Sequence, residues 1–543
     1  MSRRRGWTAA RARRLVQLAA LALFVALFLA ARESRGWAAD WAAKLFFLLD
    51  PLLLAATFLA AHAVPLLLLV SLATLVATVL LGRVFCGWFC PLGTIHDAAG
   101  WVVDRVWPNR KRRDHWSPWQ RTKYYLLAAM LVMALLGVRA ACVFDPLVLL
   151  YRSATTALMP AAQWMIEDSS TAVYQAAEEH VAARAVSAVT EPSYAMFREH
   201  VFVAPQQAFL GGGLILAVFV ALVAANAFRR RFWCRYLCPL GGLLGWFAWR
   251  PWLRRATAQA TCNQCDLCAM KCHGAAAAPG GEQWKPAECF GCLNCTDACA
   301  RESMTMTVAP PWRPDPQAES VDLSKRAMLA AMAGGVVGAC TLRITPQGRQ
   351  RTPAAELIRP PGARPEREFL ARCLACGLCM KVCPTGGLQP ALFEAGLEGL
   401  WTPYLVPRVG YCEYNCNRCG EVCPTEAIEP LTVAAKQQVQ IGLAAFDTTR
   451  CIPYAYARNC IVCEEHCPIP DKAIYFVEVE VPQRDGGKRT VLQPHIDAEK
   501  CIGCGICENK CVFRDQPAVR VRSANETRDP KNRSVLPGET GPY

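Results

Sequence analysis

Cysteine is the residue type whose number and spacing in this chain point most directly to chemistry. The 543 residues contain 30 cysteines, and 24 of them fall into six groups of four. Four groups have the spacing C-x-x-C-x-x-C-x-x-x-C, in which three thiolates bind one [4Fe–4S] cube and the fourth binds a neighbouring cube. The six groups therefore predict six [4Fe–4S] clusters that conduct electrons. They are Cys262, Cys265, Cys268 and Cys272; Cys289, Cys292, Cys295 and Cys299; Cys373, Cys376, Cys379 and Cys383; Cys412, Cys416, Cys419 and Cys423; Cys451, Cys460, Cys463 and Cys467; and Cys501, Cys504, Cys507 and Cys511.

Other uses of cysteine fit this pattern less well. Disulfide frameworks belong to short secreted chains and do not repeat C-x-x-C-x-x-C. Structural zinc sites use C-x-x-C pairs that are well separated in sequence, not triplets closed by Cys-Pro. No C-x-x-C-H sequence occurs, so covalent haem c is not expected.

Hydrophobic content and the placement of charge indicate a membrane protein. Hydrophobic residues make up 53% of the chain, and the net charge is +15. Arginine gathers beside apolar runs, which is the pattern of membrane topology rather than of a nucleic-acid surface, so we expect no nucleic-acid partner. Four apolar runs approach the roughly 20 residues that cross a bilayer. They predict an α-helical membrane bundle within residues 1–255 and lie at Leu15–Ala31, Val64–Leu81, Tyr124–Val138 and Phe209–Phe228.

The charges of the loops predict how this bundle is oriented. Basic loops at Arg83–Lys123 and Arg229–Arg255 are expected in the cytoplasm, and the acidic loop at Arg139–Phe209, with its alanine-rich helical pattern, outside. Leu45–Ala61 is also apolar, but an Asp-Pro pair interrupts it, so we expect a helix that lies at or dips into the outer interface. The predicted location is the bacterial inner membrane, with several passes. A signal peptide is the alternative for the first run, although no clear cleavage site follows.

An internal repeat adds four further cysteines to the predicted bundle. An Asp-Pro-Leu sequence, at Asp50 and again at Asp145, precedes a span that ends in C-x-x-x-C-P-L-G at its cytoplasmic side. The repeat predicts two halves related by an axis along the membrane normal, which would bring four thiols together. These thiols would ligate an additional metal or redox centre or form a dithiol couple, unless the motif only shapes the helix ends. They are Cys86, Cys90, Cys234 and Cys238.

Two cluster-binding domains of α+β, bacterial-ferredoxin-like fold are predicted outside the bundle. In the first, residues 256–310, one cube would take Cys262, Cys265, Cys268 and Cys299, and the other Cys289, Cys292, Cys295 and Cys272. This domain follows a cytoplasmic loop, so we expect it in the cytoplasm. The second domain, residues 368–522, would bind four clusters, and residues 523–543 are predicted to be a disordered polar tail.

The segment between the two domains resembles a twin-arginine export signal. Ser324-Lys325-Arg326 precedes the small apolar residues of Ala327–Leu342. Residues 324–342 are therefore expected to form a fifth span that places the second domain in the periplasm, after a Pro- and Arg-rich linker at 343–367. A short buried helix is one alternative, because the apolar run is short for a span. Cleavage near Cys340, which resembles a lipidation site, is another.

Taken together, these motifs resemble a known pair of membrane-linked proteins. Residues 1–310, with four spans, two C-x-x-x-C-P motifs and two cluster runs, resemble NapH/MauN-type membrane ferredoxins. Residues 325–520, with an export signal and four cysteine groups, resemble NapG/MauM-type exported ferredoxins. The resemblance implies a fusion of two usually separate proteins that act as a quinol dehydrogenase for periplasmic nitrate reduction. By analogy with four-cluster electron-transfer subunits, the outer two groups of the second domain would pair, and so would the inner two.

The functional hypothesis is electron transfer between the quinone pool and an extracytoplasmic partner, such as a periplasmic reductase or a multihaem cytochrome. Whether the chain is itself an enzyme, as a component of a quinol dehydrogenase, stays open. An assembly factor that reduces a metal or cofactor for another metalloenzyme is the alternative, and a redox sensor is disfavoured because no signalling module is visible. Ionisable residues at membrane depth are candidates for proton handling, although Asp-Pro pairs also cap helices. The candidates are His62, Asp50 and Asp145 near the outer face, and His96 and Asp97 after Cys90.

Overall fold

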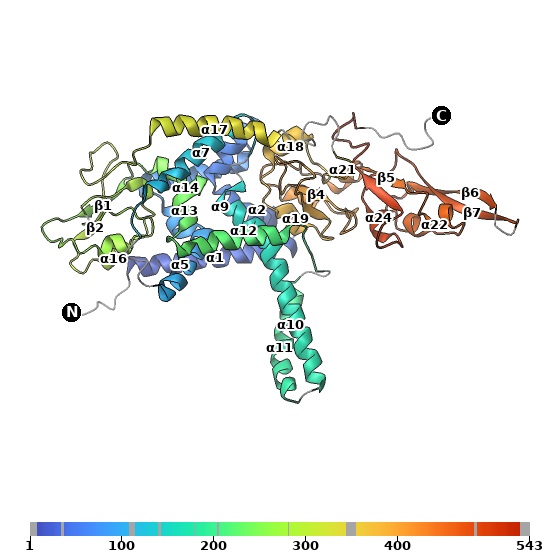
Figure 1. Cartoon of the computed structure of the whole chain (residues 1–543), viewed down its shortest axis with the longest axis horizontal. Helices are drawn as coiled ribbons and strands as arrows, with labels where there is room; N and C mark the ends of the chain where they lie inside the picture. The colour runs from blue at the N-terminus through green and yellow to red at the C-terminus, as the bar shows by residue number, and fades with distance from the viewer. Residues whose placement is uncertain are drawn as a thin grey trace. The chain divides into compact units, whose positions relative to one another are not determined.

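The chain divides into two compact units, and each unit is made of two segments that are separated in the sequence. Figure 1 colours the chain by residue number. The computed structural model describes residues 8–33, 37–107, 114–139, 143–179, 181–202, 206–280, 282–343, 354–482 and 486–532. The first unit comprises Met1–Ser153 and Leu214–Cys340, and the second comprises Ala154–Gly213 and Thr341–Tyr543. The first unit therefore holds both C-x-x-x-C-P motifs and the first pair of cysteine groups, and the second unit holds the other four groups.

The first unit is mainly helical. Its turns are set by Asp-Pro pairs: Asp50 accepts a hydrogen bond from the Leu52 amide at 2.8 Å, and Asp145 accepts one from the Leu147 amide at 2.9 Å. A carboxylate followed by proline is a favourable helix start, because proline needs no amide partner in the first turn. The helices are α1 (Ala9–Glu33), α2 (Trp37–Leu48), α3 (Pro51–Ala61), α4 (Leu72–Leu81), α5 (Pro91–Val106), α7 (Thr122–Leu135), α9 (Pro146–Ser153), α12 (Gly212–Ala224), α13 (Phe232–Tyr236), α14 (Pro239–Phe247) and α17 (Lys325–Arg343).

Among the described residues, one helix has the length and apolar composition to cross a bilayer, at Ala9–Ala31 of α1. Asp40–Leu48 and Pro51–Ala61 meet that test only as a pair, and they are bent by 90° at the Asp-Pro break. The apolar helices at Leu66–Leu81 and Gly212–Ala227 belong to a class of 10–17 residues, about 15–26 Å long at 1.5 Å per residue. The hydrocarbon core is about 30 Å thick. The predicted bundle of four spans, and the fifth span at 324–342, are therefore not confirmed.

Helix α17 follows the export-like segment and lies against α7. A Cβ on Gly335 would stand only 2.4 Å from the carbonyl oxygen of Ala129, so glycine is what permits the two backbones to approach so closely. Most side chains of α17 are nevertheless exposed.

The first cluster-binding module lies in the same unit. Strands β1 (Leu253–Thr257) and β2 (Met304–Val308) pair antiparallel, with Leu253 opposite Val308, and join the ends of the cysteine-rich segment. Two short helices, α15 (Leu267–Met270) and α16 (Asn294–Ala298), follow β1 and precede β2 in the sequence, and they lie side by side. This small α+β arrangement is the one expected for residues 256–310.

The second unit is built from short antiparallel strand pairs around one large apolar cluster and two smaller ones. The strands are β3 (Leu388–Pro390) with β4 (Pro403–Leu405), β5 (Leu443–Phe446) with β8 (Val519–Arg522), and β6 (Ile474–Pro482) with β7 (Lys488–Ile496). Its helices are α10 (Met159–Glu179), α11 (Val181–His200), α18 (Glu366–Arg372), α19 (Leu378–Val382), α20 (Arg418–Glu421), α21 (Val433–Gln437), α22 (Ile452–Ala455), α23 (Val462–Glu465) and α24 (Ile506–Lys510). Helices α10 and α11 pack side by side as a hairpin (Figure 1).

Two predicted boundaries of the second cluster domain are wrong. Part of the expected linker, residues 354–367, belongs to the fold: Leu357 and Ile358 are buried, and Arg359 forms a 2.6 Å ion pair with Glu366. Part of the expected tail, residues 523–532, also packs on the domain, and Arg528 reaches Glu366 at 2.7 Å. Pro and Arg content suggested exposure, but these arginines are paired inside the fold. Residues 344–353 and 533–543 lie outside the described residues.

Candidate metal centres

Each of four cavities in the second unit is lined by four cysteines. The cavities are small, with volumes of about 30, 20, 30 and 20 Å³. In each one, three thiols come from a single cysteine group and the fourth comes from another group. The sets are Cys373, Cys376, Cys379 and Cys423; Cys412, Cys416, Cys419 and Cys383; Cys451, Cys460, Cys463 and Cys511; and Cys501, Cys504, Cys507 and Cys467.

The predicted pairing of the four groups is wrong. Instead of outer with outer and inner with inner, the first group pairs with the second and the third with the fourth. The physical reason is the segment between the members of each pair. Strands β3 and β4 fold one connection back on itself, and β6 and β7 do the same for the other. Each hairpin returns the chain to the group that it has just left, so groups joined by a hairpin share their cavities.

Local backbone geometry explains why three thiols of one group face the same cavity. In the four groups with C-x-x-C-x-x-C spacing, the residue before the second cysteine and the residue after it both have positive φ. For the first group of the second unit these are Ala375 (φ 53°) and Gly377 (φ 82°). This turn aims amide groups at sulfur: Ala375 donates to the Cys373 sulfur at 3.4 Å, and Gly291 to the Cys289 sulfur at 3.5 Å. The groups with longer first gaps lack it, since Asn417 and Ile461 have negative φ.

The chemistry of these cavities fits an iron–sulfur cluster. The donors are thiols, and in three of the four cavities the described lining contains no charged side chain. Burial raises the pKa of Cys376, Cys463 and Cys504 to about 12. A metal that binds the thiolates must therefore displace protons that the apolar walls otherwise retain. Among the described residues no three His, Cys, Asp or Glu side chains converge closely enough to hold one metal ion; the thiols instead surround a void.

The four cavities form a connected series inside the second unit. The two hairpin-linked pairs meet where the Cys412 amide donates a hydrogen bond of 2.8 Å to the Cys504 carbonyl oxygen. Cys412 and Cys504 line different cavities. Each cavity therefore has at least one neighbour that shares a ligand-bearing segment with it.

In the first unit, Cys272 lies within electrostatic range of Cys289, Cys292 and Cys295, the set expected from the sequence. The Ala276 amide also donates to the Cys272 sulfur at 3.2 Å. The other set has the same turn, with positive φ at Gln264 and Asp266. Its assignment to Cys262, Cys265, Cys268 and Cys299 stays a prediction.

The two C-x-x-x-C-P motifs bring their four thiols together, as the repeat predicts. Cys86, Cys90, Cys234 and Cys238 are all buried, and their thiols interact electrostatically. Cys90 (φ −67°, ψ 115°) and Cys238 (φ −66°, ψ 111°) have nearly the same backbone conformation, and each precedes the proline that starts a helix. Burial raises the pKa of Cys234 to about 11, although Arg231 opposes this effect. We call this set the repeat thiols.

Two arginines at equivalent repeat positions connect the repeat thiols to the first cluster module. Arg83 and Arg231 each lie three residues before the first cysteine of their motif, and each guanidinium stands over the Phe290 ring, at 4.8 and 4.9 Å. Each arginine also crosses to the other half of the repeat. Arg231 donates to the Cys86 carbonyl oxygen at 2.7 Å, and a Cβ on Gly241 would lie 2.6 Å from Arg83.

The loop that carries Phe290 is seated directly on the first motif. Phe290 follows Cys289 and precedes Cys292 by two positions. A Cβ on Gly87 would stand 2.1 Å from the Phe290 carbonyl oxygen, so only glycine fits there. The Trp88 indole donates to the Gly291 carbonyl oxygen at 2.9 Å. A cluster-binding loop therefore touches the backbone between Cys86 and Cys90.

Two carboxylates, one fully buried and one partly buried, balance these two arginines. Glu288, fully buried, forms ion pairs with Lys123 and with Arg83 at 3.6 Å, and it accepts a hydrogen bond from Tyr124 at 3.1 Å. The counter-ion of Arg231 is Asp97, held by two hydrogen bonds of 2.6 and 2.7 Å. Sequence reasoning missed Arg83, Arg231 and Glu288. Equivalent positions in the repeat were the signal that would have identified the two arginines.

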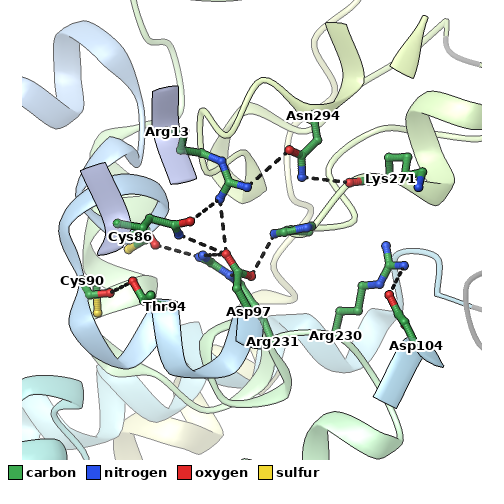
Figure 2. A network of polar contacts seen from close by, with 12 residues as sticks. Arg13, Cys86, Cys90, Thr94, Asp97, Asp104, Arg230, Arg231, Lys271 and Asn294 are labelled. Atoms are coloured by element: carbon green, nitrogen blue, oxygen red, sulfur yellow. Dashed lines mark hydrogen bonds and ion pairs between the residues drawn. The ribbon is translucent and has the colours of Figure 1, made fainter. Parts of the chain in front are cut away.

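Asp97, a predicted proton carrier, is instead the centre of a charged network (Figure 2). Arg13, Gln17 and His273 contact it at 3.3, 3.0 and 2.9 Å, in addition to Arg231. Burial alone would raise the pKa of Asp97, but Arg231 and His273 outweigh it and hold the pKa well below its usual range. Asp97 therefore stays ionised at neutral pH and serves as a counter-ion.

His96 and His62 have structural surroundings. Burial and then Arg231 lower the pKa of His96 to about 4, and its ring nitrogen Nδ1 lies 2.6 Å from the Asn226 amide nitrogen. Neutral His96 thus belongs to the packing between α5 and the segment after α12. His62 is exposed and ends α3 with a positive φ of 49°, donating its amide to the Phe58 carbonyl oxygen.

Asp50 and Asp145, predicted as proton-handling residues near the outer face, start helices in the interior of the first unit. Both are fully buried helix caps, and their carboxyl groups lie close enough to interact electrostatically. Phe144, next to Asp145, stacks on Trp233, next to Cys234, with ring centroids 6.2 Å apart. The carboxyl pair therefore lies close to the repeat thiols rather than across a layer of about 30 Å.

Comparisons with known proteins agree with this chemistry. A family model described as a 4Fe-4S binding domain matches residues 63–113 and 212–257, the two segments that carry the repeat thiols. The methylamine utilization ferredoxin-type protein MauM of Methylorubrum extorquens is 35% identical over 206 residues, covering 36% of this chain and 88% of that protein. The ferredoxin-type protein NapG of Escherichia coli is 35% identical over 165 residues, covering 30% of this chain and 69% of NapG.

A third relative extends over more of this chain. The putative electron transport protein YccM of Escherichia coli is 28% identical over 243 residues, 44% of this chain and 54% of YccM. No solved structure matches. Thiol-lined cavities and these relatives define an iron–sulfur electron-transfer protein of ferredoxin type. The chain belongs to the family of MauM- and NapG-type ferredoxin-type proteins.

Proposed function

We propose that this protein carries electrons between the quinone pool of the bacterial inner membrane and an extracytoplasmic partner, a periplasmic reductase or a multihaem cytochrome. Six [4Fe–4S] clusters, one for each cysteine group, would serve as its cofactors. The observation that carries the proposal is the connected series of four cavities in the second unit, each with four thiols. A series of like sites joined by shared segments is suited to conduction rather than to the chemistry of one substrate.

The residues around each cavity have three tasks in this proposal. When bound, a [4Fe–4S] cluster exchanges one electron at a potential set by hydrogen bonds, charge and exposure. The thiolates hold it, the amides of residues such as Ala375 and Gly291 donate to the sulfurs, and the apolar walls exclude water. Differences among these amide donors would therefore tune one site against the next.

The repeat thiols are proposed as an additional redox centre. Four buried thiols, the match of both segments to a 4Fe-4S binding domain and the adjacent cations Arg83 and Arg231 support this role. The two guanidinium groups offset part of the negative charge that thiolates would bring into a buried site. Phe290 links this centre to the module of Cys289 and Cys292.

A membrane location is part of the proposal and rests on α1, the helix that has the dimensions of a span. The first cluster module would then lie on the cytoplasmic side and the second in the periplasm, as the loop charges and the export-like segment predict.

Cofactor content and quinol reduction test the two halves of the proposal separately. The purified chain should contain about 24 iron atoms and as much acid-labile sulfide, or about 28 if the repeat thiols also bind a cluster; about eight would contradict the six-cluster proposal. Anaerobic membranes given a quinol should develop the EPR signals of reduced clusters. If dithionite produces these signals but none of the quinols tested does, the link to quinone is excluded and the iron–sulfur assignment is left intact.

A further inference from the structure

A large cavity in the first unit, with charged groups in its wall, has no role in the function described so far. Its volume is about 1010 Å³. It lies between the start of α1, one face of α5 and the loops of the first cluster module, and Figure 2 shows the network at its centre. The lining residues that matter here are Arg13, Gln17, Asp97, Trp101, His273 and Asn294.

One wall of the cavity is made by cluster-binding loops. Lys271 and His273 flank Cys272, and Asn294 lies between Cys292 and Cys295. Asn294 accepts from Arg13 at 3.4 Å, and its side-chain amide donates to the Lys271 carbonyl oxygen at 3.4 Å. A molecule in the cavity would therefore stand against the loops that hold one set of thiols, although no cysteine is among the described residues that line the cavity itself.

The rim of the cavity has the character of a membrane interface. Leu18, which lines it, belongs to the span-like helix α1 and is 58% exposed. Helix α5 and the residue that follows it present four large apolar side chains that are more than half exposed: Trp101, Val102, Val106 and Trp107. Tryptophans beside a basic residue are typical of helices at the headgroup level, and the Arg105 guanidinium lies 4.6 Å from the centre of the Trp101 ring.

The inner polar groups of the cavity suit a neutral ring with oxygen substituents. Asp97 is already neutralised by Arg13 and Arg231, so the network presents no unbalanced carboxylate to a ligand. Arg14 and Lys271 supply further donors at the wall, which would bind carbonyl oxygens and stabilise negative charge that develops on them. Trp101 offers a flat surface for a ring.

We infer that this cavity binds the head group of a membrane quinone or quinol, with its oxygens toward the network of Arg13, Gln17 and Asp97 and its tail leaving past Leu18. The inference rests on the proposed function, for which it specifies where the lipid-soluble carrier meets the protein. A ligand in this position lies within one loop of Cys272 and Cys292.

A photolabelling experiment tests the site by binding alone. The full chain in lipid nanodiscs is illuminated with an azido-benzoquinone that has a short alkyl tail, and labelled peptides are mapped by mass spectrometry. Labels should concentrate in residues 10–18 and 94–105. Trp101→Ala should weaken binding about three- to tenfold, the loss expected for one aromatic contact. Trp107→Ala is the matched control, because Trp107, which directly follows the same helix, is equally exposed but does not line the cavity.

The outcomes separate this site from the proposed function. Labels that lie elsewhere, or equal losses in the two tryptophan variants, would overturn the site. If quinol reduces the clusters of the wild type and of Trp101→Ala at the same rate, the site is wrong and the quinone-linked function stands. If the probe labels the cavity but no quinol reduces the clusters, the cavity is a binding site and the electron-transfer proposal fails.

Discussion

The two groups of thiol sites differ most in what surrounds them. Cavities in the second unit have mainly apolar walls, with charged residues in the lining of only one, where Glu413 and Arg418 occur among the described residues. The repeat thiols of the first unit instead lie beside Arg83 and Arg231, whose counter-ions are the fully buried Glu288 and the partly buried Asp97. One region isolates its sites from charge, and the other couples its site to charge.

This difference assigns different work to the two units. A cluster in an apolar cavity would gain or lose an electron with little rearrangement of the groups around it, which suits repeated electron transfer. A site with two cations, two carboxylates and an adjacent pair of buried carboxyl groups responds to each change of charge and can link it to protons. The proposed quinone cavity shares Asp97 and Arg231 with this charged region, as a two-electron, two-proton carrier would require.

The largest expected effect concerns the pairing of groups in the second unit. Cys376→Ala and Cys423→Ala remove ligands of one cavity, so each single variant and the double variant should lose the same cluster, about four iron atoms. Cys416→Ala combined with Cys423→Ala removes ligands of two cavities and should lose about eight iron atoms. Iron and acid-labile sulfide per chain measure both. A loss of eight iron atoms from the double variant Cys376→Ala/Cys423→Ala would contradict the pairing of the first group with the second.

Removal of one buried charge from the first unit should cost more stability than any surface change. Glu288→Gln leaves Lys123 and Arg83 buried without their counter-ion, which should lower the free energy of unfolding by about 3–5 kcal/mol. Denaturant unfolding in detergent measures it. Glu319→Gln, which breaks a half-exposed pair with Lys285, is the control and should change stability by less than about 0.5 kcal/mol. Similar effects at both positions would remove the contrast between the two regions.

Contact between Phe290 and the first motif should be sensitive to a single methyl group. Gly87→Ala would place a Cβ 2.1 Å from the Phe290 carbonyl oxygen, so the module must shift, at a cost of about 1–3 kcal/mol. Faster proteolysis within residues 256–310 would report the shift. Gly213→Ala is the matched control, since a Cβ there meets nothing within 4 Å. If Gly87→Ala leaves the proteolysis rate of the module unchanged, the loop is not seated as described.

Short-range patterns in the sequence predicted the grouping of cysteines well. Spacing of the C-x-x-C-x-x-C type determines a turn with two positive φ angles, as at Ala375 and Gly377, and that turn needs no distant contact. Repetition of C-x-x-x-C-P likewise predicted the meeting of Cys86 with Cys234, because equivalent segments pack equivalently.

Long-range contacts were not predictable in the same way. The pairing of cysteine groups depends on hairpins such as β6 and β7, whose return path no motif encodes. Asp97 seemed a proton carrier because it follows Cys90 closely, but its function is set by Arg13 and His273, which lie far from it in sequence. Apolar runs predicted spans by composition, while the helices that form at Leu66–Leu81 and Gly212–Ala227 are shorter than a bilayer requires.

The smallest expected effect is a pH dependence in the charged region. His96 has a folded-state pKa of about 4 and an ordinary value of 6.5, so between these values the unfolded chain binds more protons than the folded one. Stability is therefore full above pH 6.5 and falls as the pH drops toward 4, with about 1 kcal/mol lost between pH 7 and 5.5. His96→Gln should remove this part of the slope when unfolding free energies of both proteins are compared across that range. Equal slopes in the variant and the wild type would mean that His96 titrates normally, and that burial and Arg231 do not perturb it in the way the contrast with the second unit requires.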